Sequence, residues 1–322
     1  MCFRTVRALC NRNTLVLSGG LNESRSPVDE SQIAGDPRFD CVPRYCSSLR
    51  SARVVTNLTG LRLNFMSNRP DIEHWWAVDA MIASYNHVYQ VIYKTKYEVH
   101  GPIGVSIYDG APIASFHYEF LALSADSQAV MDAVCDYPVP DEKEYVIDVF
   151  HPMPSDQSLK DQYSKLDHEF VRTGPILGLD LPEKVNTIPA NVHKATTIKQ
   201  AEVANNNLTS EGERIHVQTL RDKNIHSFYV KVDGEAVGWV QLVTVYPDVG
   251  YINQLYVLEE FRRQKLGTAL VQRAHAQAVE LGLKRMVLIP SDKAMHLYRR
   301  LGYRPLLYFT AFRPVHPVRI WA

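Results

Sequence analysis

The chain has 322 residues, of which 46% are hydrophobic and 22% charged, which is typical of a folded globular protein and excludes wholesale disorder. Lys plus Arg and Asp plus Glu each number 35, so the net charge is zero and no basic field indicates nucleic-acid binding. No apolar run reaches the roughly eighteen residues of a membrane span. We therefore expect a soluble cytoplasmic protein that has neither nucleic acid nor membrane as a partner.

Residues 1–60 are rich in Ser, Gly, Pro and Arg and show neither helical nor strand periodicity. We predict that they are disordered or a non-native extension. The first twenty residues contain three arginines and no acid, so an organellar location stays open as the alternative. The cysteines are odd in number, five in all, and unevenly placed, with four of them within the first 46 residues. This pattern predicts free thiols and no metal site.

The first ordered stretch contains a hairpin pattern. Alternating β-formers flank Asp109-Gly110, and this dipeptide is a strong hairpin signal because the tight turn needs positive φ. Residues 144–152 predict the next strand, and residues 156–170 predict a helix directly after it.

The same order of elements recurs later in the chain. Asp233-Gly234 lies within a second alternating run, which is followed again by a strand pattern, at 250–258, and then by a helical pattern. Prolines 182 and 189 interrupt any regular element between the two copies. We therefore predict a tandem of one fold, with domains at 65–185 and 190–315.

The second copy has the clearer helical signals. Apolar residues recur at helical spacing as a stripe that we expect to face the core, namely Leu266, Leu270, Ala274, Ala278 and Leu281. Glycines at 282 and 302 predict the ends of this helix and of a later one, which Ser291 is expected to N-cap. The other predicted elements are a helix at 196–212 and strands at 285–289 and 305–312.

Two motifs of the second copy indicate chemistry. The loop RRQKLG (262–267) matches the pattern Arg/Gln-x-x-Gly-x-Gly/Ala except at Lys265, and the helix AMHLYRRLGY (294–303) matches Ala-x-x-Leu-Tyr-x-x-x-Gly-Phe/Tyr throughout. Residues 190–315 thus resemble the GNAT superfamily of acyl-CoA-dependent N-acyltransferases. The resemblance implies an α+β fold of tandem GNAT-like domains, each with a mixed, mostly antiparallel central sheet flanked by helices.

The resemblance implies acetyl-CoA as a co-substrate. Unpaired N–H groups at the start of a helix favour a pyrophosphate, Gly267 allows close approach, and the basic side chains add charge-assisted contacts. Lys265 replaces the family's first glycine, so either the loop is wider or Lys265 itself reaches a phosphate. The residues expected to contact the cofactor are Leu255, Tyr256, Val257, Arg262, Arg263, Gln264, Lys265, Leu266, Gly267, Thr268, Ser291 and Tyr298.

The implied reaction is the direct attack of a primary amine, expected on a small molecule, on the acetyl thioester. By the resemblance, Tyr298 is the general acid that protonates the leaving thiolate, and a core aromatic is its other interpretation. A protein or peptide N-acetyltransferase and a non-catalytic acyl-CoA-binding module stay open as alternatives. The acceptor, the acyl chain length and the oligomeric state are not determined by the sequence.

The general base is not evident from the sequence. Many relatives have a glutamate on the strand before the loop, whereas Asn253 and Gln254 occupy those positions here, and neither amide is a useful base. A water chain ending at Asp248 or Tyr251 stays open, as does a carboxylate from the first copy such as Glu119.

The first copy lacks the phosphate loop. MPSDQSLKDQ (153–162), at the place that matches by order of elements, has no glycine and carries acids that would repel a pyrophosphate. We predict a degenerate copy that does not bind CoA but packs on the second copy and walls the acceptor site. Its residues expected in the core and interface are His74, Trp75, Trp76, Tyr85, Tyr89 and Tyr93.

Overall fold

The computed structural model describes residues 70–315, except 71, 109–115, 141–142, 185–188 and 207–213. The predictions for residues 1–60 and for the Asp109-Gly110 turn therefore lie outside the described residues. The helices are α2 (Trp75–Tyr93), α3 (Ser127–Asp136), α4 (Gln157–Lys165), α5 (Ile198–Asn205), α6 (Leu266–Glu280) and α7 (Met295–Arg300). The strands are β1 (Lys96–His100), β2 (Ile103–Ile107), β3 (Tyr118–Ala122), β4 (Tyr145–His151), β5 (His168–Asp180), β6 (Val192–Ala195), β7 (Ile225–Val232), β8 (Glu235–Tyr246), β9 (Val249–Val257), β10 (Arg285–Leu288) and β11 (Arg304–Pro314).

These strands form one sheet in the order β1-β2-β3-β4-β11-β5-β10-β9-β8-β7-β6. Neighbours are antiparallel except at β3–β4 and β9–β10, which are parallel. Parallel neighbours need a crossover connection, and α3 and α6 lie between the two strands of each parallel pair in sequence. The predicted α+β fold, with a mixed, mostly antiparallel sheet flanked by helices, is confirmed.

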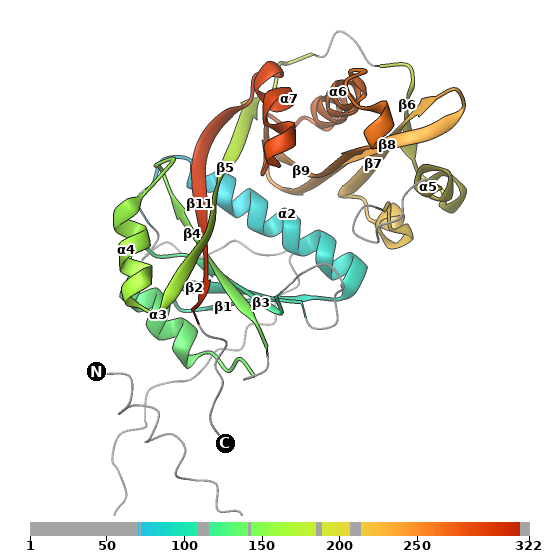
Figure 1. Cartoon of the computed structure of the whole chain (residues 1–322). Helices are drawn as coiled ribbons and strands as arrows, with labels where there is room; N and C mark the ends of the chain where they lie inside the picture. The colour runs from blue at the N-terminus through green and yellow to red at the C-terminus, as the bar shows by residue number, and fades with distance from the viewer. Residues whose placement is uncertain are drawn as a thin grey trace, which may run out of the picture. The chain divides into compact units, whose positions relative to one another are not determined.

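The two halves of the chain exchange their last strands. The first half runs β3, α3, β4, α4, β5, and the second half repeats this series as β9, α6, β10, α7, β11. However, β11 pairs with β4 of the first half, and β5 pairs with β10 of the second half. β5 and β11 lie side by side in the middle of the sheet (Figure 1). The repeated series supports the tandem organisation in part, and the domain limits at 65–185 and 190–315 stay predictions.

The elements of the two copies correspond differently from the prediction. Residues 144–152 were expected to match the strand at 250–258, but β4 follows a helix and pairs in parallel, so its counterpart is β10. The hairpin β2–β3 therefore corresponds to β8–β9 rather than to β7–β8. The prediction was wrong because it overlooked α3, which Asp126 caps by accepting the N–H groups of Gln128 and Ala129.

Helix α2 covers one face of the sheet and contacts strands from both halves (Figure 1). Its apolar residues pack in one cluster with side chains from eight strands of both halves, including Phe150, Ile176, Tyr251, Val287 and Phe309. Separate apolar clusters on the opposite face hold α3 and α4 against the first half and α5, α6 and α7 against the second. Helix α2 is apolar around much of its circumference, as expected for a helix buried on several sides.

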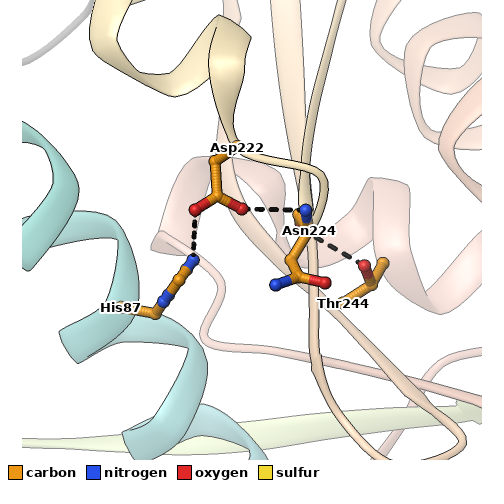
Figure 2. Close-up of polar contacts among 4 residues, drawn as sticks. All are labelled: His87, Asp222, Asn224 and Thr244. Atoms are coloured by element: carbon orange, nitrogen blue, oxygen red, sulfur yellow. Dashed lines mark hydrogen bonds and ion pairs between the residues drawn. The ribbon is translucent and has the colours of Figure 1, made fainter. Parts of the chain in front are cut away.

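A polar contact fixes the C-terminal part of α2 to the second half. His87 Nε2 lies 2.9 Å from Asp222 Oδ2, and Asp222 Oδ1 accepts the backbone N–H of Asn224 at 2.8 Å. Thr244 on β8 donates its hydroxyl to the Asn224 carbonyl at 3.3 Å, so the contact continues into the sheet (Figure 2). This contact positions the last turns of α2 beside β8 and β9.

Helix α6 follows the predicted stripe except at its end. Leu266, Leu270, Ala274 and Ala278 are buried, whereas Leu281 is 47% exposed. Leu281 follows the last helical residue, and the chain turns away at Gly282, whose φ is +77°. The prediction for Leu281 was wrong because the helical period ends one residue earlier.

Candidate active site

One edge of β9 is open along its second half. Its first residues pair with β10 as far as Tyr251, which lies opposite Val287. The three residues from Leu255 to Val257 pair with β8 on the other side, but no described strand pairs with their second edge. The two central strands thus separate beyond Tyr251, and the second edge of β9 from Leu255 to Val257 faces the gap between them.

A β-bulge places two amides on one face of β9. Gln241 lies opposite Gln254, but the next residue of β8, Leu242, lies opposite Ile252, so Asn253 is the extra residue. Asn253 donates its amide to Gln241 Oε1 at 2.9 Å. In a regular strand, the side chains of Asn253 and Gln254 would point to opposite faces of the sheet. Because of the bulge, both line the same pocket.

The loop before α6 exposes backbone donors and positive charge. Arg263 and Lys265 both have left-handed backbones, with φ of +67° and +64°. Such alternation of φ turns successive N–H groups to one side, as in anion-binding nests. In the described part of the chain, the N–H groups of Leu266, Gly267 and Thr268 have no acceptor. Arg262 differs from the other cations because its Nε donates to the Val257 carbonyl at 3.0 Å and holds the loop to β9.

Replacement of Lys265 by glycine should stabilise the protein. A left-handed backbone costs an L-residue with a side chain about 1 kcal/mol, which glycine does not incur. We expect Lys265→Gly to raise the free energy of unfolding by roughly this amount in urea denaturation, while CoA affinity becomes less salt-dependent. Gln264→Gly is the matched control, because Gln264 has no positive φ and its replacement should destabilise. Equal effects of the two changes would contradict the interpretation.

Gly267 brings the start of α6 close to α7. A Cβ added at Gly267 would lie 2.8 Å from Leu297 Cδ1, so only a hydrogen fits without movement of that side chain. Tyr298 follows Leu297 and is buried, with its ring centroid 5.4 Å from that of Tyr303. Burial raises the pKa of Tyr298 above its ordinary value, so the hydroxyl keeps its proton at neutral pH.

Ser291 precedes the turn that leads into α7 and is exposed. Its hydroxyl makes no capping bond to the following turn, Asp292–Ala294. Ser291 thus occupies the N-cap position of this turn, and its backbone carbonyl accepts the Ala294 N–H, but the expected cap by its side chain is not formed.

A pocket lies beside the bulge, between α2 of the first half and the second half. It is lined by Val88, Tyr89, Ile92 and Tyr93 from α2, by Arg214 and His216, by Trp239 and Gln241 from β8, and by Asn253 and Gln254 from β9. None of these residues is acidic. The sequence predictions missed Arg214, His216, Trp239 and Gln241, but the spacing of Tyr85, Tyr89 and Tyr93 by four residues already marks one face of a helix.

The suggested bases lie in different surroundings. Asp248 is exposed in the turn before β9, with its carboxylate 4.0 Å from Lys284 Nζ, and it precedes Asn253 by five residues, four of them on the extended strand. Tyr251 is buried, and burial, followed by Tyr89, Glu119 and Tyr298, raises its pKa above the ordinary value. Neither residue is suited to take a proton in the pocket at neutral pH.

Glu119 is half-buried on β3 beside a second carboxyl group, Asp148 on β4. Burial, and next the charge of Asp148, raise the pKa of Glu119 from 4.5 to about 8. Burial likewise raises the pKa of Asp148 from 3.8 to about 6. Two adjacent carboxyls share a proton because both cannot ionise cheaply.

This pair should make stability depend on pH. Because the folded state raises the pKa of Glu119, the folded state binds its proton more tightly than the unfolded state does. That contribution is complete below pH 4.5 and is lost as the pH rises through about 8. We expect thermal unfolding to show that Glu119→Gln loses less stability than the wild type between pH 5 and pH 9. Identical pH dependence of the two proteins would contradict the assignment.

The first half has no open strand edge that corresponds to β9. β3 is paired with β4 up to its last residue, Ala122, which lies opposite Val149. Because β3 and α3 correspond to β9 and α6, the residues that correspond to the phosphate loop are 123–126 rather than 153–162. There the Asp126 carboxylate itself accepts N–H groups at the start of α3. These features support the prediction that this half does not bind CoA.

Two further features concern the described residues as a whole. No group of three His, Cys, Asp or Glu side chains is arranged there to hold a metal ion. None of the helices in this part of the chain has both the length and the apolar character to cross a membrane.

Comparison with known proteins agrees with the geometry. Residues 196–303 match the model of the acetyltransferase (GNAT) family. An N-alpha-acetyltransferase from Sulfurisphaera tokodaii is 29% identical, over 27% of this chain and 62% of its own length, so the match spans less than two thirds of that relative. The structure of a GCN5-related N-acetyltransferase from Kribbella flavida is similar in fold, with a TM-score of 0.55 and 18% identity over 74% of this chain and 96% of that one. The resemblance found in the sequence is confirmed, and residues 196–303 form a domain of the GNAT acetyltransferase family.

Proposed function

We propose that this protein transfers an acetyl group from acetyl-CoA to a primary amine of a small molecule by direct attack on the thioester. The observation that carries the proposal is the open edge of β9, which leads from the pocket at Asn253 to the unpaired N–H groups at the start of α6. A long cofactor complements this surface if it has amides in its arm, to pair with the strand edge, and phosphates at one end, to accept from the N–H groups.

Each part of the surface fits one part of acetyl-CoA. The open edge of β9 from Leu255 to Val257 suits the amides of the pantetheine arm. The start of α6, with Arg263, Gln264 and Lys265 exposed around it, suits the pyrophosphate. Leu266, Gly267 and Thr268 contribute their N–H groups, and Ser291 contributes an uncommitted exposed hydroxyl.

Tyr298 is proposed to donate a proton to the sulfur as the thiolate leaves. A thiolate has a pKa of roughly 8.5, so a neutral phenol at this position lowers the barrier to its departure. The bulge at Asn253 interrupts the ladder and leaves polar groups directed toward the acceptor. These groups orient the amine for attack on the carbonyl carbon.

The lining of the pocket favours a small acceptor. Helix α2 of the first half forms one wall, which supports an acceptor site between the halves. Arg214 and His216 line it, and the absence of acidic residues among its lining residues disfavours a basic peptide. A peptide N-terminus is the second candidate, because the related protein from Sulfurisphaera tokodaii is named an N-alpha-acetyltransferase.

A panel of amines tests the proposal. Purified full-length protein is incubated with acetyl-CoA and small primary amines or short peptides, and acetylated products are identified by mass spectrometry. We expect acetylation of at least one small amine, with peptides acetylated more slowly. Tight CoA binding in calorimetry without turnover on any amine would show that the protein binds acyl-CoA but is not an enzyme.

A further inference from the structure

A row of tyrosines lies between the pocket and the half-buried carboxyl pair of the first half. Tyr89, at the pocket wall, has its ring centroid 4.3 Å from that of Tyr85. The Tyr85 ring centroid in turn lies 6.4 Å from that of Tyr108. Tyr108 donates its hydroxyl to Glu119 Oε2 at 2.5 Å, and Glu119 in turn contacts Asp148.

The surroundings of this row are fixed by other contacts. Tyr108 is almost fully buried, at 2% exposure, and lies 5.8 Å from Tyr89 between ring centroids. Below it, Ser106 on β2 donates its hydroxyl to Asn86 of α2 at 2.9 Å, which ties the helix to the first half. The phenols thus lie between α2 and the sheet in a defined order.

The carboxyl pair has no evident structural purpose. Two adjacent carboxyl groups in a half-buried site reduce stability, and apolar residues of similar size would be better there. The charged and titratable groups around Glu119 are Tyr108, Asp148 on β4, Arg172 on β5, Tyr85 and Tyr89 on α2, and Tyr251 on β9. Arg172 is the only cation in this set and is itself exposed over the ring of Phe309.

We propose that Glu119 is the proton acceptor of the reaction and takes the proton of the acceptor ammonium through Tyr89, Tyr85 and Tyr108. This inference rests on the proposed acetyl transfer. It also explains how the second half works without a carboxylate on β9, because Asn253 and Gln254 cannot supply the base.

The proton transfers balance along the row. The ammonium gives one proton to the Tyr89 oxygen while Tyr89 passes its own proton to Tyr85, Tyr85 to Tyr108, and Tyr108 to the Glu119 carboxylate. All three phenols remain neutral, and the amine becomes a nucleophile. As the C–N bond forms and the C–S bond breaks, Tyr298 gives its proton to the sulfur and the nitrogen's second proton replaces it on the Tyr298 oxygen, so CoA leaves as the thiol and Tyr298 is neutral again. Glu119 keeps contact with solvent, so its proton leaves after each turnover.

The raised pKa of Glu119 suits this role. An ordinary carboxylate is too weak a base to take a proton from an amine at neutral pH, and a proton acceptor works best when its pKa lies near the working pH. Asp148, beside Glu119, contributes to the rise.

The test is the pH profile of kcat/KM for the full-length enzyme with the best amine from the panel. We expect Glu119→Gln and Tyr89→Phe to lower kcat/KM about 100-fold near pH 7. Both should approach the wild-type rate near pH 10, where the amine loses its proton in solution. Because the two residues act in one row, the double variant should be no slower than Glu119→Gln alone. Glu98→Gln is the matched control, since Tyr137 donates to Glu98 away from the pocket, and it should keep the wild-type profile.

The outcomes separate the two proposals. Wild-type turnover with an unchanged profile in Glu119→Gln overturns the relay and leaves acetyl transfer standing. A loss in Glu119→Gln that is equal at every pH also overturns it, because a structural defect is not rescued by deprotonating the amine. Failure of the wild type on every amine overturns the proposed function, and the relay with it.

Discussion

Tyr298→Phe should reduce kcat about 100-fold while acetyl-CoA binds with unchanged affinity. The phenylalanine ring keeps the packing against Tyr303 but cannot donate a proton to the leaving sulfur. The change therefore affects the transition state and not the bound cofactor, and kcat and kcat/KM should fall by the same factor. Steady-state kinetics at saturating acetyl-CoA, together with calorimetry of CoA binding, measure both quantities.

Tyr303→Phe provides the matched control for this experiment. Tyr303 is also buried, and its hydroxyl lies 2.8 Å from His275 Nε2. Loss of that hydrogen bond should lower the free energy of unfolding by about 1 kcal/mol without a comparable effect on kcat. If Tyr298→Phe instead behaved like Tyr303→Phe, Tyr298 would be a core aromatic only.

Gly267→Glu should weaken CoA binding at least about 100-fold. The carboxylate would lie at the start of α6, where the helix dipole and the free N–H groups otherwise favour the pyrophosphate. Isothermal titration calorimetry with CoA measures the loss directly. Because a Cβ at this position meets Leu297, the variant should also be less stable, by about 1–3 kcal/mol.

Gly267→Ala separates charge from crowding. It introduces the same Cβ and displaces Leu297 in the same way, but adds no negative charge. We expect a similar loss of stability in thermal unfolding and less than about a tenfold loss of CoA affinity. Equal loss of affinity in both variants would mean that crowding at α7, and not repulsion of phosphates, sets the effect.

Local patterns predicted the parts of the site that depend on neighbouring residues. The apolar stripe from Leu266 to Ala278 and the motif ending at Tyr303 predicted α6, α7 and the basic loop between strand and helix. Lys265 was the one departure from the family's loop motif, and the structure gives it the left-handed backbone that glycine favours. The chain therefore keeps the turn despite the changed residue.

Features set by distant pairing could not be predicted in this way. The exchange of β5 and β11 depends on which strands meet across the chain, and each of them has the same alternating pattern in either position. The bulge at Asn253 depends on the register of β9 against β8, which the sequence of β9 alone does not determine. Glu119 was named as an isolated possibility because its neighbours Asp148 and Tyr108 are brought to it by the sheet and by α2.

The exchanged strands impose an order on biosynthesis. His151 on β4 lies opposite Tyr308 on β11, which the ribosome adds 157 residues later (308 − 151). Until then, the edge of β4 is unpaired and available to other chains, a known cause of aggregation. Neither half can complete its sheet during translation, so the nascent chain should depend on chaperones until its last strand is released. Such long-range closure also makes refolding slow.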